Sequence, residues 1–191
     1  PSVLTMQYET PWGMPTPVGG YALAAMRHMH EYGTTSQQLA EIAVATRQWA
    51  ALNPAAMMRG PLSVDDVLAS PMICDPLHLL DACLVTDGGG AVVMTSAEHA
   101  RAIGHRKPVY VRGYGEAHTH WTIAAMPDLA RLTAAEIAGR EAFAMAGVRP
   151  DDIDVVELYD SFTITVLLTL EALGFCKRGE GGAFVSNQRT A

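Results

Sequence analysis

The 191-residue sequence has few cysteines, few aromatic residues and no excess of positive charge, and these shortages exclude several classes of protein. Its three cysteines, Cys74, Cys83 and Cys176, are an odd number without CxxC spacing, which disfavours a disulfide framework and a cysteine-held metal. A formal net charge of −7 disfavours a nucleic-acid surface. No apolar helix reaches the roughly 20 residues that a membrane span needs. We therefore expect a soluble, cytoplasmic protein that binds no nucleic acid.

Common catalytic signatures are also missing. The sequence has no GxxxxGK phosphate loop and no GxSxG elbow, and Asp87-Gly88-Gly89-Gly90 precedes an expected strand rather than a helix. His118 and His120 alternate and can share one face of a strand, but no third metal ligand has a fitting local spacing. We expect no metal site, and we expect His118 to line a pocket instead, because its segment forms a loop between a strand and a helix.

The opening residues are rich in proline yet carry apolar side chains. Residues 1–19 cannot form a long helix or a central strand, because four prolines interrupt them. Trp12 and Met14 within this segment indicate a loop that packs over another part of the protein.

Helical patterns follow this loop. The spacing predicts one helix over Val18–Tyr32 that stops at Gly33, and a second that starts near Thr35 or Ser36 and ends before Asn53. A short third helix is expected from Ser63, where Ser63 and Asp66 fit a capping box.

Strand and helix patterns alternate in the second half. Apolar β-branched runs predict strands at 89–94, 109–111 and 153–158. Helices are expected after each run: one capped by Thr95 or Ser96 and running through Ile103, one capped by Thr133 through Ala146, and one over 162–173. This alternation favours an α/β fold with largely parallel strands.

The residues Tyr159-Asp160-Ser161-Phe162 end the last of these strands and open the last helix. Open α/β folds bind ligands at such strand ends, so a phenol, a carboxylate and a hydroxyl there indicate a candidate site. Two structural interpretations remain open. Ser161 or Asp160 can cap the helix, and Tyr159 can be a buried tyrosine with a satisfied hydroxyl.

Several motifs together resemble the thiolase superfamily. The segment 84–96 is similar to the thiolase Ser-Gly-x-Asn-Asp-Gly-Ala segment with its following strand and Ser-capped helix, and 146–157 is similar to the approach to the thiolase Asn-Glu-Ala-Phe motif. Here Tyr159-Asp160-Ser161-Phe162 stands at that motif, and 61–77 matches as well. These features resemble the lipid-transfer branch, related to sterol-carrier-protein thiolases, and a tyrosine there looks like its steroid side-chain aldolases.

The resemblance implies a partial thiolase-like α/β fold with a helical loop domain. Residues 1–86 would be the loop domain that covers an acyl-CoA. Residues 87–105 would end the N-terminal half of the fold, and 106–191 would begin the C-terminal half. The thiolase regions with the nucleophilic cysteine and the Gly-His-Pro motif have no counterpart here. The chain therefore looks like an internal fragment, which we expect to be inactive alone.

The resemblance also implies an activity. We expect an enzyme that makes or breaks a carbon–carbon bond next to a CoA thioester, most like retro-aldol cleavage of a lipid or steroid side chain. Tyr159 would move the proton, because a phenol is a hydrogen-bond donor, with Asp160 as the alternative base. Cys83 matches a thiolase serine near the pantetheine arm, and Met14 and Trp12 would cover the acyl chain. CoA enters as the substrate thioester, and no cofactor is expected to be covalently bound.

Two other functions remain open. Acetyl-CoA C-acyltransferase activity fits if the regions outside this chain carry the cysteine and histidine, and a non-catalytic lipid-transfer or acyl-CoA-binding role fits if they do not. The resemblance further implies a homodimer and a partner subunit with an OB fold and a zinc ribbon.

Overall fold

Residues 7–14, 17–104 and 107–191 are described by the computed structural model. Residues 1–6, 15–16 and 105–106, which belong to the expected opening loop and to the expected boundary near 105, lie outside the described residues. Helix α2 (Val18–Tyr32) runs as the spacing predicts. It ends at Gly33, whose φ of 72° favours glycine and whose N–H donates to the Met29 carbonyl oxygen.

Side-chain caps start the next two helices as predicted. Helix α3 (Ser36–Leu52) begins at Thr35, whose hydroxyl accepts from the Gln38 N–H while the Gln38 side chain accepts from the Thr35 N–H. Helix α4 (Val64–Ala69) begins at Ser63 with the same reciprocal arrangement to Asp66.

Among the described residues, four further helices lie in the second half, and single 3₁₀ turns occur along the chain. The helices are α5 (Ala97–Ala102), α6 (Thr133–Ala146), α7 (Thr163–Leu173) and α8 (Gly181–Val185). The 3₁₀ turns are η1 (Thr10–Trp12), η2 (Leu79–Asp81), η3 (Ile123–Ala125), η4 (Pro150–Asp152) and η5 (Ser186–Gln188). Ser96 caps α5 as expected. The expected cap at Thr133 is wrong, because α6 starts after Leu132 without a side-chain hydrogen bond.

The strand predictions are corrected by the structure. Among the described residues, the only strands are β1 (Met72–Cys74) and β2 (Leu77–His78), which form an antiparallel pair. The runs 89–94, 109–111 and 153–158 lie outside any sheet, and Val92 and Val93 are 87% and 93% exposed. The pattern identifies apolar residues with a high β propensity. A strand also needs a neighbouring strand as a hydrogen-bonding partner, and no described segment pairs with these runs.

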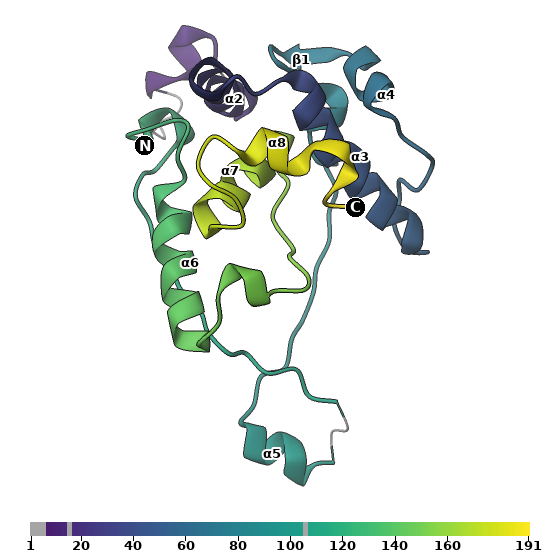
Figure 1. Cartoon of the computed structure of the whole chain (residues 1–191), viewed down its shortest axis with the longest axis vertical. Coiled ribbons are helices and arrows are strands. Elements are labelled where there is room, and N and C mark those ends of the chain that lie inside the picture. Colours follow the sequence, from purple (N-terminus) through teal and green to yellow (C-terminus); the bar gives the residue numbers. More distant parts are fainter. Residues whose placement is uncertain (1–6, 15–16, 105–106) are drawn as a thin grey trace.

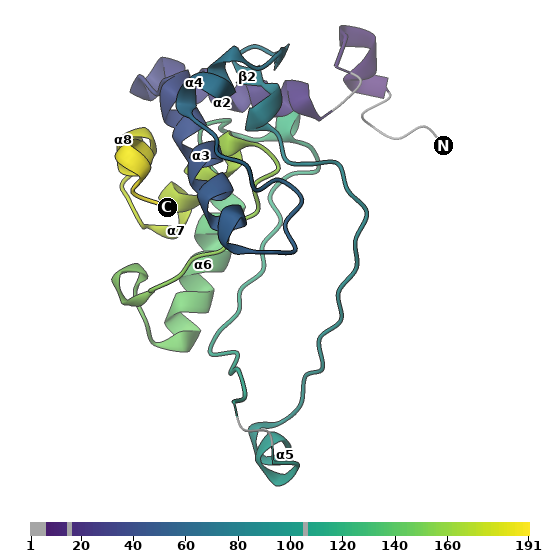
Figure 2. The ribbon, with the colours of Figure 1, turned by 90° about the vertical axis from the view of Figure 1, so that its right-hand side faces the viewer.

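Two long stretches of chain leave the helical body and carry α5 at their far end (Figures 1 and 2). The returning stretch lies along α6 through Gly113 and Gly115. A Cβ on Gly113 would lie 2.2 Å from the Ala142 carbonyl oxygen, and one on Gly115 would lie 2.0 Å from that of Ala138. Only glycine therefore permits this approach of backbone to helix.

Helix α7 is the centre of the helical body. It packs against α2, α3, α6 and α8, which lie around it in Figure 1. Its sequence is mostly apolar without a dominant polar face, as expected of a helix enclosed by others. The core around it consists of small and branched apolar side chains: Ala22, Ala24, Ala25, Leu39, Ile42, Leu77, Ile164, Leu167, Leu168, Leu170 and Val185.

One polar network is buried in this core. His28 on α2 is fully buried; its Nε2 donates to Oε1 of Glu171 on α7 at 3.1 Å, and its Nδ1 lies 2.8 Å from the Thr34 hydroxyl. The Gly181 N–H at the start of α8 donates to the same carboxylate oxygen at 2.8 Å. Burial alone would raise the pKa of Glu171. The hydrogen bonds from His28 and the backbone outweigh burial, so its pKa is lowered from 4.5.

Glu171→Gln tests whether this network stabilises the fold. The pKa of Glu171 is lower in the folded state than its unfolded value of 4.5. Its contribution to the free energy of unfolding is therefore complete above pH 4.5, and it is lost as the pH falls through the folded-state pKa. We expect the variant to lose roughly 1.5–3 kcal/mol at pH 7 in urea unfolding of the full-length protein, since a hydrogen-bonded charge is lost. The difference should shrink below pH 4; an equal difference at pH 7 and pH 3 would contradict this role.

Candidate functional site

Two short segments, 81–83 and 161–163, are joined side by side where α7 begins. The Thr163 hydroxyl donates to Oδ1 of Asp81 at 2.8 Å. Ala82 and Phe162 form an isolated antiparallel bridge, and the Cys83 N–H donates to the Ser161 carbonyl oxygen at 3.2 Å. We call these three contacts the 81–163 clasp. The clasp fixes the turn that follows Tyr159 and Asp160 against the end of η2.

The expected helix cap at Ser161 or Asp160 is wrong. Helix α7 starts after Phe162, which has no capping side chain. The Ser161 hydroxyl instead lies 2.8 Å from that of Thr165. Asp81, which is only 4% exposed, places a carboxylate at the first residue of α7, where negative charge is favourable. A distant residue therefore makes a side-chain hydrogen bond at the start of α7, where no local side chain caps the helix.

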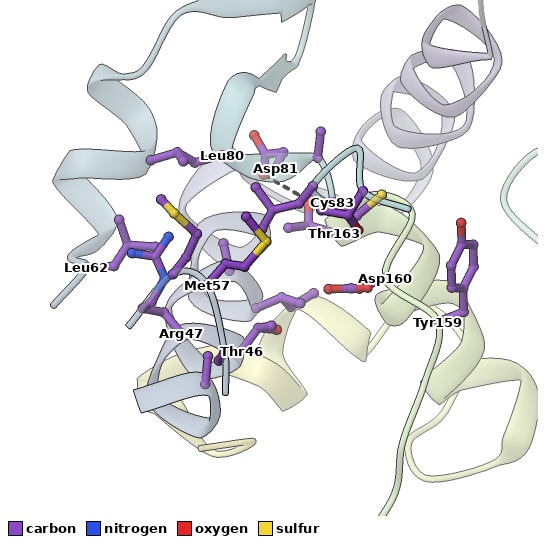
Figure 3. Close-up of a pocket in the computed structure, with 18 residues that line it drawn as sticks. Thr46, Arg47, Met57, Leu62, Leu80, Asp81, Cys83, Tyr159, Asp160 and Thr163 are labelled. Atoms are coloured by element: carbon purple, nitrogen blue, oxygen red, sulfur yellow. Dashed lines mark hydrogen bonds between the residues drawn. The ribbon is translucent and has the colours of Figure 1, made fainter. Parts of the chain in front are cut away.

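A cavity of about 530 Å³ opens beside the clasp, within the size range of small-molecule sites. It lies between α3, the segment 56–62, η2 and the turn at 159–163 (Figure 3). Tyr159, Asp160 and Cys83, which the sequence predicts as site residues, all line it. The structure thus brings these three together from segments about eighty positions apart.

Neighbouring residues Tyr159 and Asp160 point in different directions. In Figure 3 the Asp160 carboxylate is directed toward the middle of the cavity, while the Tyr159 ring stands at its edge and is turned away. Tyr159 is 73% exposed and is not the buried tyrosine of the structural interpretation. The Asp160 carboxylate is therefore open to a ligand inside the cavity, and the Tyr159 phenol to one at its rim.

Arg47 lines the same cavity on the side opposite Tyr159 (Figure 3). It projects from α3 beside Thr46, and its guanidinium donates to the Gly60 carbonyl oxygen at 3.2 Å. Met57 and Leu62 supply apolar wall next to it. The cavity therefore combines a fixed positive charge, an apolar side, a carboxylate and a phenol. Sequence reasoning did not select Arg47, because it looks like any polar-face residue of a helix.

The other predicted site residues lie elsewhere. Met14 lines two smaller cavities beside α2, and Trp12 on η1 is 84% exposed and lines none of the three described cavities. The His118 side chain is also largely exposed and pairs with Glu116 at 2.9 Å. His120, two residues on, lines one of the cavities beside α2.

Cys176 differs from Cys83 in its chemistry. Burial, together with the nearby Glu171 and Glu180 carboxylates, raises the pKa of the Cys176 thiol to about 12. It therefore stays protonated and unreactive near neutral pH. Cys83 is exposed at the cavity.

Among the described residues, no three His, Cys, Asp or Glu side chains gather closely enough to hold a metal ion. No helix in the same part of the chain is both long and apolar enough to cross a membrane.

Comparison with known proteins gives consistent matches. The Thiolase C-terminal domain-like family model matches residues 115–191. The acetyl-CoA acetyltransferase of Methanothermobacter thermautotrophicus is 42% identical over 85% of this chain and 42% of that protein. The steroid side-chain-cleaving aldolase of Thermomonospora curvata is 38% identical over 93% of this chain and 46% of that protein. The solved Ltp2-ChsH2(DUF35) aldolase has a TM-score of 0.89 at 37% identity, covering 96% of this chain and 49% of that one.

The chain thus spans somewhat less than half the length of the curated relatives it matches. The matches confirm the expected fold class, a partial α/β thiolase-like fold.

The two cysteines allow a direct test of this geometry. At pH 8 we expect iodoacetamide to alkylate Cys83, whereas Cys176, with a thiolate fraction on the order of 10⁻⁴, should react far more slowly. Mass spectrometry of peptides from the full-length protein measures both rates in one sample, and denatured protein provides the control in which both react. Equal rates in the folded protein would show that Cys176 is not shielded.

Proposed function

Because the chain belongs to the thiolase superfamily, on the branch of the sterol-carrier-protein thiolases, we propose that it forms part of an enzyme acting on carbon–carbon bonds next to a CoA thioester. The reaction proposed is retro-aldol cleavage of a lipid or steroid side chain. The observation that carries this proposal is the shared cavity, lined by Asp160 and Cys83 with Tyr159 at its rim, across from Arg47. Relatives that are called aldolases support it.

The proposed cleavage acts on a β-hydroxyacyl-CoA. A base removes the proton of the β-hydroxyl group, and its oxygen forms a carbonyl as the bond between the α and β carbons breaks. The bonding electrons pass to the α carbon and form the thioester enolate. Protonation of the α carbon then releases a shortened acyl-CoA and a ketone or aldehyde. The enzyme must therefore accept one proton, return one proton and stabilise an oxyanion.

Tyr159 and Asp160 are the groups that we assign to proton transfer. The phenol can donate to or accept from the β-oxygen, and the Asp160 carboxylate is the alternative base. Within the described residues, no hydrogen bond engages the Asp160 carboxylate, so it remains available to a substrate. Cys83 lies beside them, where we propose that it contacts the pantetheine arm.

We assign CoA recognition to the opposite side of the cavity. CoA carries phosphates, and Arg47 offers a guanidinium that is already oriented by Gly60. CoA enters as a substrate thioester, so the proposal needs no covalently bound cofactor. Met14 and Trp12 are proposed to lie over the acyl group; Met14 lines cavities beside α2 that are separate from the one at Tyr159. His118 is proposed as a lining residue, although here its neighbour His120 faces a cavity.

The organisation of the protein is also a proposal. We propose that 1–86 is the loop domain over the acyl-CoA, that 87–105 ends one half of the thiolase fold, and that 106–191 begins the other. We further propose a homodimer and a partner subunit with an OB fold and a zinc ribbon. The name of the Ltp2-ChsH2(DUF35) aldolase, which joins two components, supports a partner.

Acyl transfer is the second candidate function. It is favoured by the 42% identity to an acetyl-CoA acetyltransferase. Thiolysis needs a nucleophilic cysteine, and Cys176 is too strongly protonated to serve. Thiolysis of a β-ketoacyl-CoA by the full-length protein distinguishes this function from aldol cleavage.

Tyr159→Phe tests the proposed chemistry. It removes one hydroxyl from an exposed ring, so folding should be unaffected. We expect kcat for release of propionyl-CoA from a β-hydroxyacyl-CoA to fall roughly 10²–10⁴-fold, the range for loss of a general acid or base. The assay uses the full-length protein with its partner subunit.

Tyr114→Phe is the matched control, because Tyr114 is equally exposed but lines none of the described cavities. Unchanged turnover in Tyr159→Phe would remove the phenol from the mechanism. If the wild type turns over neither a β-hydroxyacyl-CoA nor a β-ketoacyl-CoA, both enzymatic proposals fail and acyl-CoA binding without catalysis is the remaining function.

Arg47→Ala tests the assignment of CoA recognition. Loss of a charge-assisted hydrogen bond, worth about 1.5–3 kcal/mol, should raise KM roughly 10–100-fold with little change in kcat. Arg47→Lys should retain part of the effect, because it keeps the charge but not the planar fork. The same KM for wild type and Arg47→Ala would contradict the assignment.

A further inference from the structure

We propose that Asp81 is a positioning residue for the reaction: through Thr163 it sets the turn that presents Tyr159 and Asp160. This inference rests on the proposed function. It concerns a residue that lines the cavity yet is turned into the protein rather than toward a ligand.

Both oxygens of the Asp81 carboxylate are already occupied. Oδ1 accepts from the Thr163 hydroxyl at 2.8 Å, and Oδ2 accepts from the His78 N–H, also at 2.8 Å. With only 4% of the residue exposed, little of it is left for a substrate. Asp81 is therefore poorly suited to act as the base itself, whereas the neighbouring Asp160 is directed into the cavity.

Asp81 stands on a well-anchored segment. Leu77, fully buried in β2, precedes it, and the Leu79 N–H donates to the Pro71 carbonyl oxygen at 2.8 Å. The Leu80 N–H donates to the Ser70 hydroxyl at 3.3 Å. These contacts tie η2 to the chain between α4 and β1, so the carboxylate has a defined position before it meets α7.

The partner of Asp81 is the first residue of α7. Thr163 follows the proposed proton-transfer residues by three and four positions, and the bonds of the 81–163 clasp leave little freedom between them. Since Phe162 provides no cap, the hydrogen bond to Asp81 is the side-chain contact that ties the start of α7 to a segment distant in sequence. A small shift of this start would move the whole turn, and a displacement of about 1 Å can cost roughly 10²-fold in rate.

Four variants of the full-length protein with its partner, and one control, test the inference. Asp81→Ala and Thr163→Val should each lower kcat roughly 10²-fold while KM changes less than about threefold. Because Thr163→Val removes a hydrogen bond that Asp81→Ala also removes, the double variant should be no worse than Asp81→Ala alone. Thr163→Ser, which keeps the hydroxyl, should restore turnover. Asp66→Asn is the control, since Asp66 is a helix-start carboxylate outside the cavity.

Two further measurements separate positioning from general loss of stability. In a Tyr159→Phe background, Asp81→Ala should lower kcat by a smaller factor than in the wild type, because one of the two groups that it places is already gone. Amide hydrogen exchange of Cys83, whose N–H belongs to the clasp, should speed up at least roughly tenfold in Asp81→Ala and stay unchanged in Asp66→Asn.

The outcomes are distinct. Faster exchange with a lowered, non-additive kcat supports the inference. Full turnover in Asp81→Ala, in an enzyme that Tyr159→Phe impairs, overturns it while the proposed function stands. Effects of Asp81→Ala and Tyr159→Phe that simply multiply would also overturn it. If Tyr159→Phe is fully active, the proposed function fails. Independently of turnover, unchanged amide exchange of Cys83 in Asp81→Ala would contradict the role of Asp81 in holding the 81–163 clasp together.

Discussion

The site depends on a hydrogen bond between a buried carboxylate and the first residue of a helix. Asp81 and Thr163 are 82 positions apart, yet their contact joins the two halves of the cavity wall. One half brings Cys83 and the other brings Tyr159 and Asp160. A carboxylate deprived of water is stabilised only when its oxygens find donors, and here the Thr163 hydroxyl and the His78 N–H provide them. The geometry of the proposed chemistry follows from this requirement.

A second polar contact holds the same helix near its other end. Glu171 in the last turn of α7 meets His28 of α2 and the first N–H of α8. Between these contacts α7 is mostly apolar and has no dominant polar face, and such a surface by itself allows several rotations and shifts with similar burial. Two polar contacts near opposite ends remove that freedom, because only one rotation and one height satisfy both. Buried polar groups can select one packing arrangement in this way.

The sequence predicts local features well and pairwise features poorly. The ends of α2, α3 and α4 follow from Gly33, Thr35 and Ser63, whose signals lie within four residues of the helix end that they set. The three β-branched runs have the local pattern of strands, but none pairs with another described segment. A local pattern cannot show this, because a strand needs a hydrogen-bonding neighbour that is distant in sequence. The site shows the same division. Tyr159, Asp160 and Cys83 were predicted from motifs, whereas Arg47 and Asp81 acquire their importance from neighbours distant in sequence.

The two glycines that lie against α6 constrain how this family of chains can vary in length. Gly113 and Gly115 face the helix from the same side of an extended segment, where any larger residue meets a carbonyl oxygen. Inserting or deleting one residue just before Gly113 would turn the neighbouring side chains toward α6 and the glycines away from it. Changes of two residues would preserve the side that each position faces. Natural variants should therefore gain or lose residues beyond this segment, near the exposed end that carries α5, rather than within it.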